Sequence, residues 1–125
     1  MNKGLILIVE DDVSIRESLS ELLDLEGFAF QVASDGFQAI SLLTESERKP
    51  DAILLDLMMP VCSGYAFLEI IKDVSDLKSI PIIIMSAAAN AEETARAHHL
   101  AMVKKPIHVD DLLKLLEVVI TQNSL

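Results

Sequence analysis

The fold is decided by the stretch Leu5-Ile6-Leu7-Ile8-Val9-Glu10-Asp11-Asp12, in which five apolar residues run directly into three acids. An unbroken apolar run of this length is typical of a strand buried on both faces, and such strands occur in parallel sheets that helices cover. The acids would then lie at the carboxyl edge of the sheet, where ligands bind in open α/β folds. The stretch therefore predicts both an α/β architecture and the position of a site.

Four further apolar segments have the character of strands, and they cover residues 28–32, 52–55, 82–85 and 101–103. Between the strands, apolar residues recur with a period of about 3.6, which is typical of helices with one buried face. The first helix follows Asp12 as its cap and closes at Gly27. The other predicted helices cover residues 37–43, 65–71, 91–97 and 108–121. Because strand and helix alternate five times with short connections, we predict a (βα)5 unit with right-handed crossovers.

Composition limits the class of protein. A chain of 125 residues suits one domain, so we expect a single domain over residues 1–125. Ten Lys and Arg residues against 20 Asp and Glu residues give a net charge of −10, which disfavours binding to nucleic acids and anionic membranes. The longest apolar run, five residues, cannot span a bilayer. The one cysteine, Cys62, and a start without a hydrophobic signal segment favour a reducing, cytoplasmic location.

Polar residues at the ends of the predicted strands form a constellation made of Glu10, Asp11, Asp56, Ser86 and the pair Lys105-Pro106. Three acids in one place repel one another unless cations neutralise them. The ammonium of Lys105 and a hard divalent cation balance this charge, and oxygen ligands suit Mg2+, with Mn2+ as the alternative. The same cation, Lys105 and the Ser86 hydroxyl could hold a phosphoryl group on Asp56. Asp56 is therefore predicted to be a nucleophile that forms an aspartyl phosphate.

These residues carry a family resemblance. The sequence resembles the receiver domain of two-component response regulators over nearly its full length, through the motifs Ile8-Val9-Glu10-Asp11-Asp12, Leu55-Asp56-Leu57-Met58-Met59-Pro60, Met85-Ser86-Ala87 and Lys104-Lys105-Pro106. It is most similar to the stand-alone, chemotaxis-regulator-like type. The resemblance implies a flavodoxin-like (βα)5 three-layer sandwich with a parallel five-stranded sheet of order 2-1-3-4-5.

The resemblance also assigns the metal and phosphorylation site. It implies that Asp56 is the phospho-accepting aspartate and that Asp11 is a direct metal ligand. Glu10 matches the second acid, which acts through water, and the backbone carbonyl of Met58 matches the main-chain metal ligand.

Further positions match residues that respond to phosphorylation. Ser86 resembles the hydroxyl switch residue, and Lys105 resembles the lysine that binds the phosphoryl group, with a cis bond to Pro106 expected. Met102 stands where relatives carry an aromatic switch residue, and its flexible apolar side chain lacks the phenol's hydrogen bond. The side chains of Met58 and Ala88 border the expected path of the attacking water and cannot orient it, which predicts slow self-dephosphorylation.

The implied role is in a phosphorelay two-component system. A sensor histidine kinase or a histidine phosphotransfer protein would donate the phosphoryl group, and a downstream protein would bind the surface of the fourth helix, fifth strand and fifth helix. The domain would be no enzyme beyond assisting its own phosphoryl transfer and dephosphorylation. Because the chain stops after the fifth helix, we expect no output domain, and we expect a monomer or weak homodimer.

Other functions compete with this interpretation. An aspartyl-nucleophile phosphatase would need a second acid two residues after Asp56, where Met58 stands. A flavodoxin-like cofactor carrier would need a phosphate-binding loop after Val9, where acids stand. A scaffold that binds partners without being phosphorylated stays open at this point.

Several residues have simpler structural interpretations. We expect Asp12 to cap a helix, Met58 and Met59 to pack, and Cys62 to be a small loop residue. The fourth helix would be anchored weakly, mainly by Ala91, Ala95 and Ala97, and Val118 would be exposed on the fifth helix.

Overall fold

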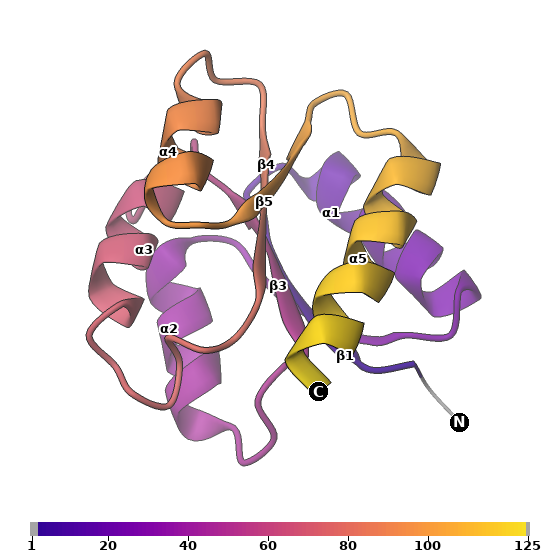
Figure 1. Cartoon of the computed structure of the whole chain (residues 1–125), viewed down its shortest axis with the longest axis horizontal. Helices are drawn as coiled ribbons and strands as arrows, with labels where there is room; N and C mark the ends of the chain where they lie inside the picture. The colour runs from indigo at the N-terminus through magenta and orange to yellow at the C-terminus, as the bar shows by residue number, and fades with distance from the viewer. Residues whose placement is uncertain (1–2, 125) are drawn as a thin grey trace.

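Five parallel strands form the middle layer of the computed structural model, which describes residues 3–124. The sheet order is β2-β1-β3-β4-β5, made of β1 (Leu5–Val9), β2 (Ala29–Ala33), β3 (Ala52–Asp56), β4 (Ile82–Ser86) and β5 (Ala101–Lys104). Figure 1 shows that helices cover both faces of the sheet. The helices are α1 (Val13–Leu25), α2 (Gly36–Glu45), α3 (Gly64–Ile71), α4 (Ala91–Ala97) and α5 (Val109–Ser124). The predicted flavodoxin-like sandwich and its strand order are confirmed.

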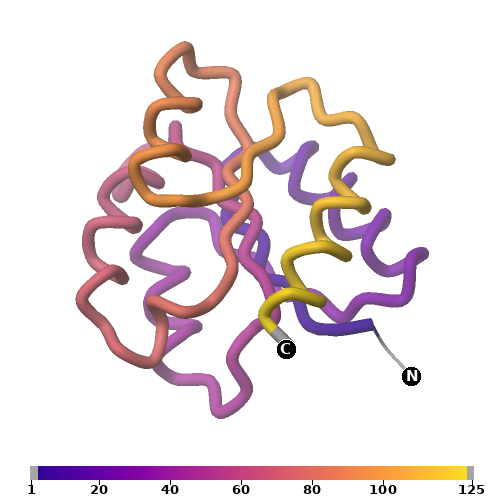
Figure 2. The backbone as a smooth tube through the Cα atoms, viewed as in Figure 1, coloured from indigo at the N-terminus to yellow at the C-terminus, as the bar shows by residue number. Residues whose placement is uncertain are grey.

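The central strands are buried on both faces, as the unbroken apolar runs predict. Every residue of β1, β3 and β4 is buried. In β1, Ile6 and Ile8 face the core beneath α1 and α5, whereas Leu7 and Val9 face the core beneath the other three helices. The backbone trace in Figure 2 shows the same two groups of helices around the sheet. A two-sided core explains why these strands lack alternating polar residues.

Short connections at the carboxyl ends of the strands fix where the helices begin. The side chains of Asp12, Asp35 and Ser63 each accept a hydrogen bond from a backbone N–H in the first turn of the helix that follows. These contacts satisfy N–H groups that a helix leaves free at its start. The interpretation of Asp12 as a helix cap is confirmed, and the caps hold the loops around the sheet edge in place.

Two glycines allow close packing near this edge. A Cβ atom on Gly64 would lie 2.4 Å from the backbone oxygen of Asp56. A Cβ atom on Gly36 would lie 2.5 Å from the sulfur of Cys62, which is buried beneath the start of α2. Cys62 is therefore a packing residue within its loop rather than an exposed one.

Some local expectations were wrong. The Met58 side chain is 63% exposed, because the turn after β3 directs it outward, whereas Met59 is buried as expected. Ala97 is exposed, so α4 buries only Ala91 and Ala95 of its predicted anchors. Val118 is exposed, as predicted.

Among the residues that the structure describes, no helix combines the length and apolar character needed to cross a membrane.

Candidate functional site

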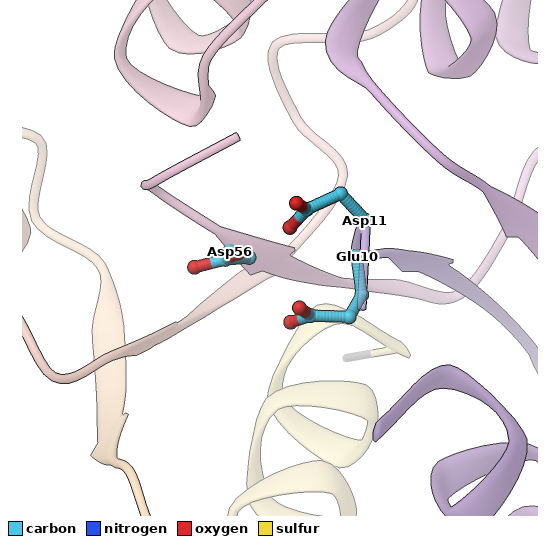
Figure 3. A group of neighbouring side chains, drawn as sticks. All are labelled: Glu10, Asp11 and Asp56. Atoms are coloured by element: carbon cyan, nitrogen blue, oxygen red, sulfur yellow. The ribbon is translucent and has the colours of Figure 1, made fainter. Parts of the chain in front are cut away.

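The carboxyl ends of β1 and β3 bring three acids together. Figure 3 shows the side chains of Glu10, Asp11 and Asp56 pointing toward one side of these strand ends. One carboxylate oxygen from each residue lies within 4.8 Å of the other two. The parallel register places Val9 opposite Leu55, so Glu10 and Asp56 directly follow paired residues. Asp11 and Asp56 are therefore close in space although 45 positions separate them in the sequence.

Two of the three acids are almost completely buried. Glu10 is 1% exposed and Asp56 is 3% exposed, whereas Asp11 lies nearer to the solvent. Burial raises the pKa of Glu10, and the negative charge of Asp56 adds to this effect. Burial likewise raises the pKa of Asp56, and Asp11 adds to it. The site is thus built to favour a positive charge at its centre.

Lys105 supplies one positive charge to this site. Its Nζ lies 2.9 Å from Oε2 of Glu10 and 3.5 Å from Oδ1 of Asp56. Burial lowers the pKa of Lys105, but the hydrogen bond to Glu10 and the charge of Asp56 outweigh this effect and raise it overall. The lysine therefore stays charged, and it bridges the two buried carboxylates. Its peptide bond to Pro106 is cis.

Ser86 completes the group at the end of β4. Ser86 is buried, and its hydroxyl oxygen accepts a hydrogen bond from the backbone N–H of Ala88 at 3.0 Å. Its backbone carbonyl accepts a hydrogen bond from the backbone N–H of Lys105 at 3.1 Å. The serine is thus held against the same lysine that contacts Asp56.

Backbone groups orient the two buried acids. The N–H of Met58 donates to Oδ1 of Asp56 at 3.2 Å, and the N–H of Asp12 donates to Oε1 of Glu10 at 3.2 Å. The guanidinium of Arg16 donates to the backbone carbonyl of Glu10 at 3.1 Å. Sequence reasoning missed Arg16, which looks like an ordinary residue of an exposed helix.

The site carries more negative than positive charge, and a divalent cation would balance the difference. Three carboxylates and one ammonium give a net charge of about −2 when all four groups are ionised. All the side-chain donors among the acids are oxygens, which suit a hard cation such as Mg2+. The residues present therefore fit a magnesium site.

A cavity of about 330 Å³ lies beside Ser86 and Lys105. It is lined by residues that include Ser86, Ala88, Glu92, Met102 and Lys104. Met102 is half-buried and borders this cavity. The structure thus brings together all the side chains predicted from the strand ends and places Met102 beside them.

Comparisons with known proteins identify the family. The family model of the response regulator receiver domain matches residues 6–117. The chain is 42% identical over 87 residues to the transcriptional regulatory protein CpxR of Klebsiella pneumoniae subsp. pneumoniae (strain HS11286), a match that covers 70% of this chain and 34% of that protein. It is 29% identical over 122 residues to the response regulator MprA of Mycobacterium sp. (strain KMS), with 95% of this chain and 51% of that protein covered. The chain thus spans about a third to a half of the length of these curated relatives.

Solved structures agree with this family. The chemotaxis protein CheY4 of Vibrio cholerae superposes with a TM-score of 0.81 at 28% identity, and the match covers 93% of this chain and 98% of that chain. The chain belongs to the response regulator receiver domain family, a class of signalling domain that acts in two-component systems. The resemblance inferred from the sequence motifs is confirmed.

Proposed function

We propose that Asp56 accepts a phosphoryl group from the phosphohistidine of a sensor histidine kinase or a histidine phosphotransfer protein. The observation that carries this proposal is a buried carboxylate that lies beside a charged lysine and two further acids. A carboxylate oxygen of Asp56 attacks phosphorus, the new P–O bond forms, and the P–N bond to the donor's imidazole breaks. The electron pair of that bond leaves with the imidazole, which is then free to take up a proton.

Glu10, Asp11, Asp56 and the backbone carbonyl of Met58 would hold Mg2+, with Mn2+ as a substitute. The cation supplies positive charge for the oxygens of the transferring phosphoryl group. Lys105 neutralises a further part of that charge, and it exchanges its contact with Asp56 for a contact with a phosphoryl oxygen. The hydroxyl of Ser86 donates to another phosphoryl oxygen from the end of β4.

The output would be a change in protein contacts. The cavity beside Ser86 extends to Met102 and Lys104 on β5, and across to Glu92 on α4. Movement of Ser86 and Lys105 toward a phosphoryl group would therefore alter the packing of residues that reach the surface. We propose that a downstream protein reads this change on the surface formed by α4, β5 and α5. Met102 is the candidate side chain that changes position.

The test is intact-mass measurement after incubation with Mg2+ and acetyl phosphate. The native chain is expected to gain one phosphoryl group, and Asp56→Asn is expected to gain none. Asp12→Asn is the matched control, because Asp12 caps α1 and an asparagine preserves the cap. A gain that persists in Asp56→Asn would contradict the proposal. No adduct with any donor would favour a scaffold, and steady phosphate release from unrelated esters would favour a hydrolase.

A further inference from the structure

The free edge of β2 has an unusual surface for a chain of this charge. The strand lies at the end of the sheet, and residues 27–34 contain no charged side chain. Phe30 is 39% exposed and Val32 is 40% exposed. Both side chains lie on the sheet face of α1 and α5, because they pair with Ile6 and Ile8. Natural sheets usually protect such an edge with charges or proline, and this edge has neither.

Two residues of β2 have backbone N–H and C=O groups that point away from the sheet along this edge. The N–H of Ala29 donates to Gly4, and the carbonyl of Ala33 accepts from Glu10, so alternate residues direct their backbone groups toward β1. Phe30 and Val32 consequently direct theirs outward. No residue within the described range 3–124 bonds these outward groups.

On both sides of Phe30 and Val32, the next outward N–H group already donates a hydrogen bond within the chain. At one end, the N–H of Phe28 donates to Leu23 at the end of α1. At the other end, the N–H of Ser34 donates to the side chain of Gln38 at 2.6 Å. The open edge is therefore two residues, centred on Gln31.

The exposed edge of β2 is complementary to the same edge in a second copy of the chain. The segment Ala29-Phe30-Gln31-Val32-Ala33 has an apolar residue on each side of Gln31 and an alanine at each end. If a second copy pairs antiparallel with Gln31 opposite Gln31, Phe30 of each copy lies opposite Val32 of the other. Both members of each pair present an outward N–H and C=O, so the two pairs exchange four hydrogen bonds. Each pair also joins an aromatic to a β-branched side chain, which is a favourable cross-strand combination.

We propose that β2 is a self-association edge, at which two copies of this chain join into one ten-stranded sheet around a two-fold axis at Gln31. A cavity of about 380 Å³ lies beside Val32 and is lined by Arg16, Ser34, Gln38 and Leu42, so no side chain fills the space next to this edge. The association is weak, because four hydrogen bonds and two apolar pairs oppose the repulsion between two chains of net charge −10. Because β5 is the opposite edge of the sheet, the surface of α4, β5 and α5 stays accessible in the pair.

The first test is sedimentation velocity over a series of protein concentrations. The native chain is expected to approach twice its mass of 13.7 kDa as concentration rises. Val32→Lys is expected to weaken association about tenfold or more, because it introduces charge into the edge. Val118→Lys is the matched control, since it changes a valine of similar exposure, 47%, on α5, and its association is expected to equal that of the native chain. A native chain that stays monomeric up to millimolar concentration, or dissociation by Val118→Lys alone, would overturn the proposal.

Two further measurements test the pairing itself. Hydrogen exchange at the amides of Phe30 and Val32 is expected to slow as concentration rises, whereas the outward amides of Met102 and Lys104 on β5 are expected to be unchanged. This measurement needs no variant, so it decides the question even if Val32→Lys fails to fold. The double variant Phe30→Glu/Val32→Lys is expected to associate more strongly than Val32→Lys, because the antiparallel register sets each Glu opposite a Lys. Protection at β5 instead of β2 would refute the edge, and a double variant no stronger than Val32→Lys would refute the register.

Higher salt gives an independent readout. Screening reduces the long-range repulsion between two acidic chains, and residues 27–34 carry no charged side chain whose pairing salt would weaken. Association of the native chain is therefore expected to strengthen as salt concentration rises. Association that weakens with salt would point to an interface built on ion pairs and would overturn the proposal.

Discussion

Replacing Lys105 by methionine removes the positive charge that two buried carboxylates share. The Nζ atom lies 2.9 Å from Glu10 and 3.5 Å from Asp56, and the Lys105 side chain is only 19% exposed. Removing one partner from a buried ion pair costs about 3–5 kcal/mol, because the remaining charge has lost its compensation. Proton uptake by the carboxyls limits this cost, so we expect about 3 kcal/mol at about pH 8. For a domain of this size, that lowers the midpoint of thermal unfolding by roughly 10 °C.

The cost is expected to depend on pH. Burial already raises the pKa values of Glu10 and Asp56, and loss of Lys105 raises them further. A folded state with a raised carboxyl pKa binds protons that the unfolded chain does not bind, so stability falls as the pH rises between the two pKa values. The cost of Lys105→Met therefore shrinks as the pH is lowered toward about pH 5, by up to about 1.4 kcal/mol per pH unit.

Urea unfolding in the presence of a chelator, at about pH 5 and about pH 8, measures both effects. Lys104→Met is the matched control, because Lys104 is the adjacent residue and pairs with exposed Glu92 at the surface. A surface ion pair contributes little to stability, so the control is expected to resemble the native chain at both pH values. An equal loss of stability in the two variants, or a cost of Lys105→Met that does not change with pH, would refute the reasoning.

Three other predictions concern the same edge of the sheet. Gly64→Ala places a Cβ atom 2.4 Å from the backbone oxygen of Asp56, so we expect a loss of about 1–3 kcal/mol in urea unfolding and slower phosphorylation by acetyl phosphate. Met58→Asn adds a polar group beside Asp56, and we expect the phosphorylated form to decay faster in a time course of intact mass. Mg2+ is expected to raise the midpoint of thermal unfolding at about pH 7.5 and to raise it less at about pH 5, because protons compete for carboxyls whose pKa values burial has raised.

Each of these predictions has a control. Gly36→Ala also adds a methyl group at the start of a helix, but its nearest backbone contact, the oxygen of Cys62, lies at 3.0 Å instead of 2.4 Å, so its cost is expected to be smaller. Val61→Asn changes another exposed residue of the same loop as Met58 and is expected to leave the decay rate unchanged. Asp11→Asn is expected to reduce the effect of Mg2+ on unfolding. A smaller cost for Gly64→Ala than for Gly36→Ala, faster decay in both loop variants, or an undiminished Mg2+ effect would contradict these expectations.

The apolar runs predict the strands well, because burial on both faces leaves a signal in consecutive residues. Phe28 is an exception, because the apolar pattern predicts that it lies in a strand. Its N–H donates to Leu23 at 2.9 Å, so Phe28 closes α1, and β2 begins at Ala29. Competition between a helix end and a strand start depends on hydrogen bonding, which an apolar pattern does not reveal.

The composition of the site was predictable, but its internal contacts were not. Topology alone predicts that the ends of parallel strands meet, and this prediction brings Glu10, Asp56 and Lys105 together. Which acid Lys105 approaches more closely depends on side-chain length and depth, and the closer one is Glu10. The outward direction of Met58 depends in the same way on the turn after β3, because an apolar side chain gives no signal of a turn that exposes it. The hydrogen bond from Tyr65 to Asn90 at 2.8 Å joins α3 to the start of α4, and no local sequence pattern indicates it.

The packing of Cys62 beneath α2 also determines how this protein can be studied chemically. Its thiol is buried, and burial together with the charge of Asp35 raises its pKa, so little reactive thiolate forms at neutral pH. Because Cys62 is the only cysteine of the chain, a cysteine introduced at an exposed position could carry a fluorescent or spin label with little background reaction. Slow labelling of Cys62 itself would then report how often the loop between β3 and α3 opens in solution.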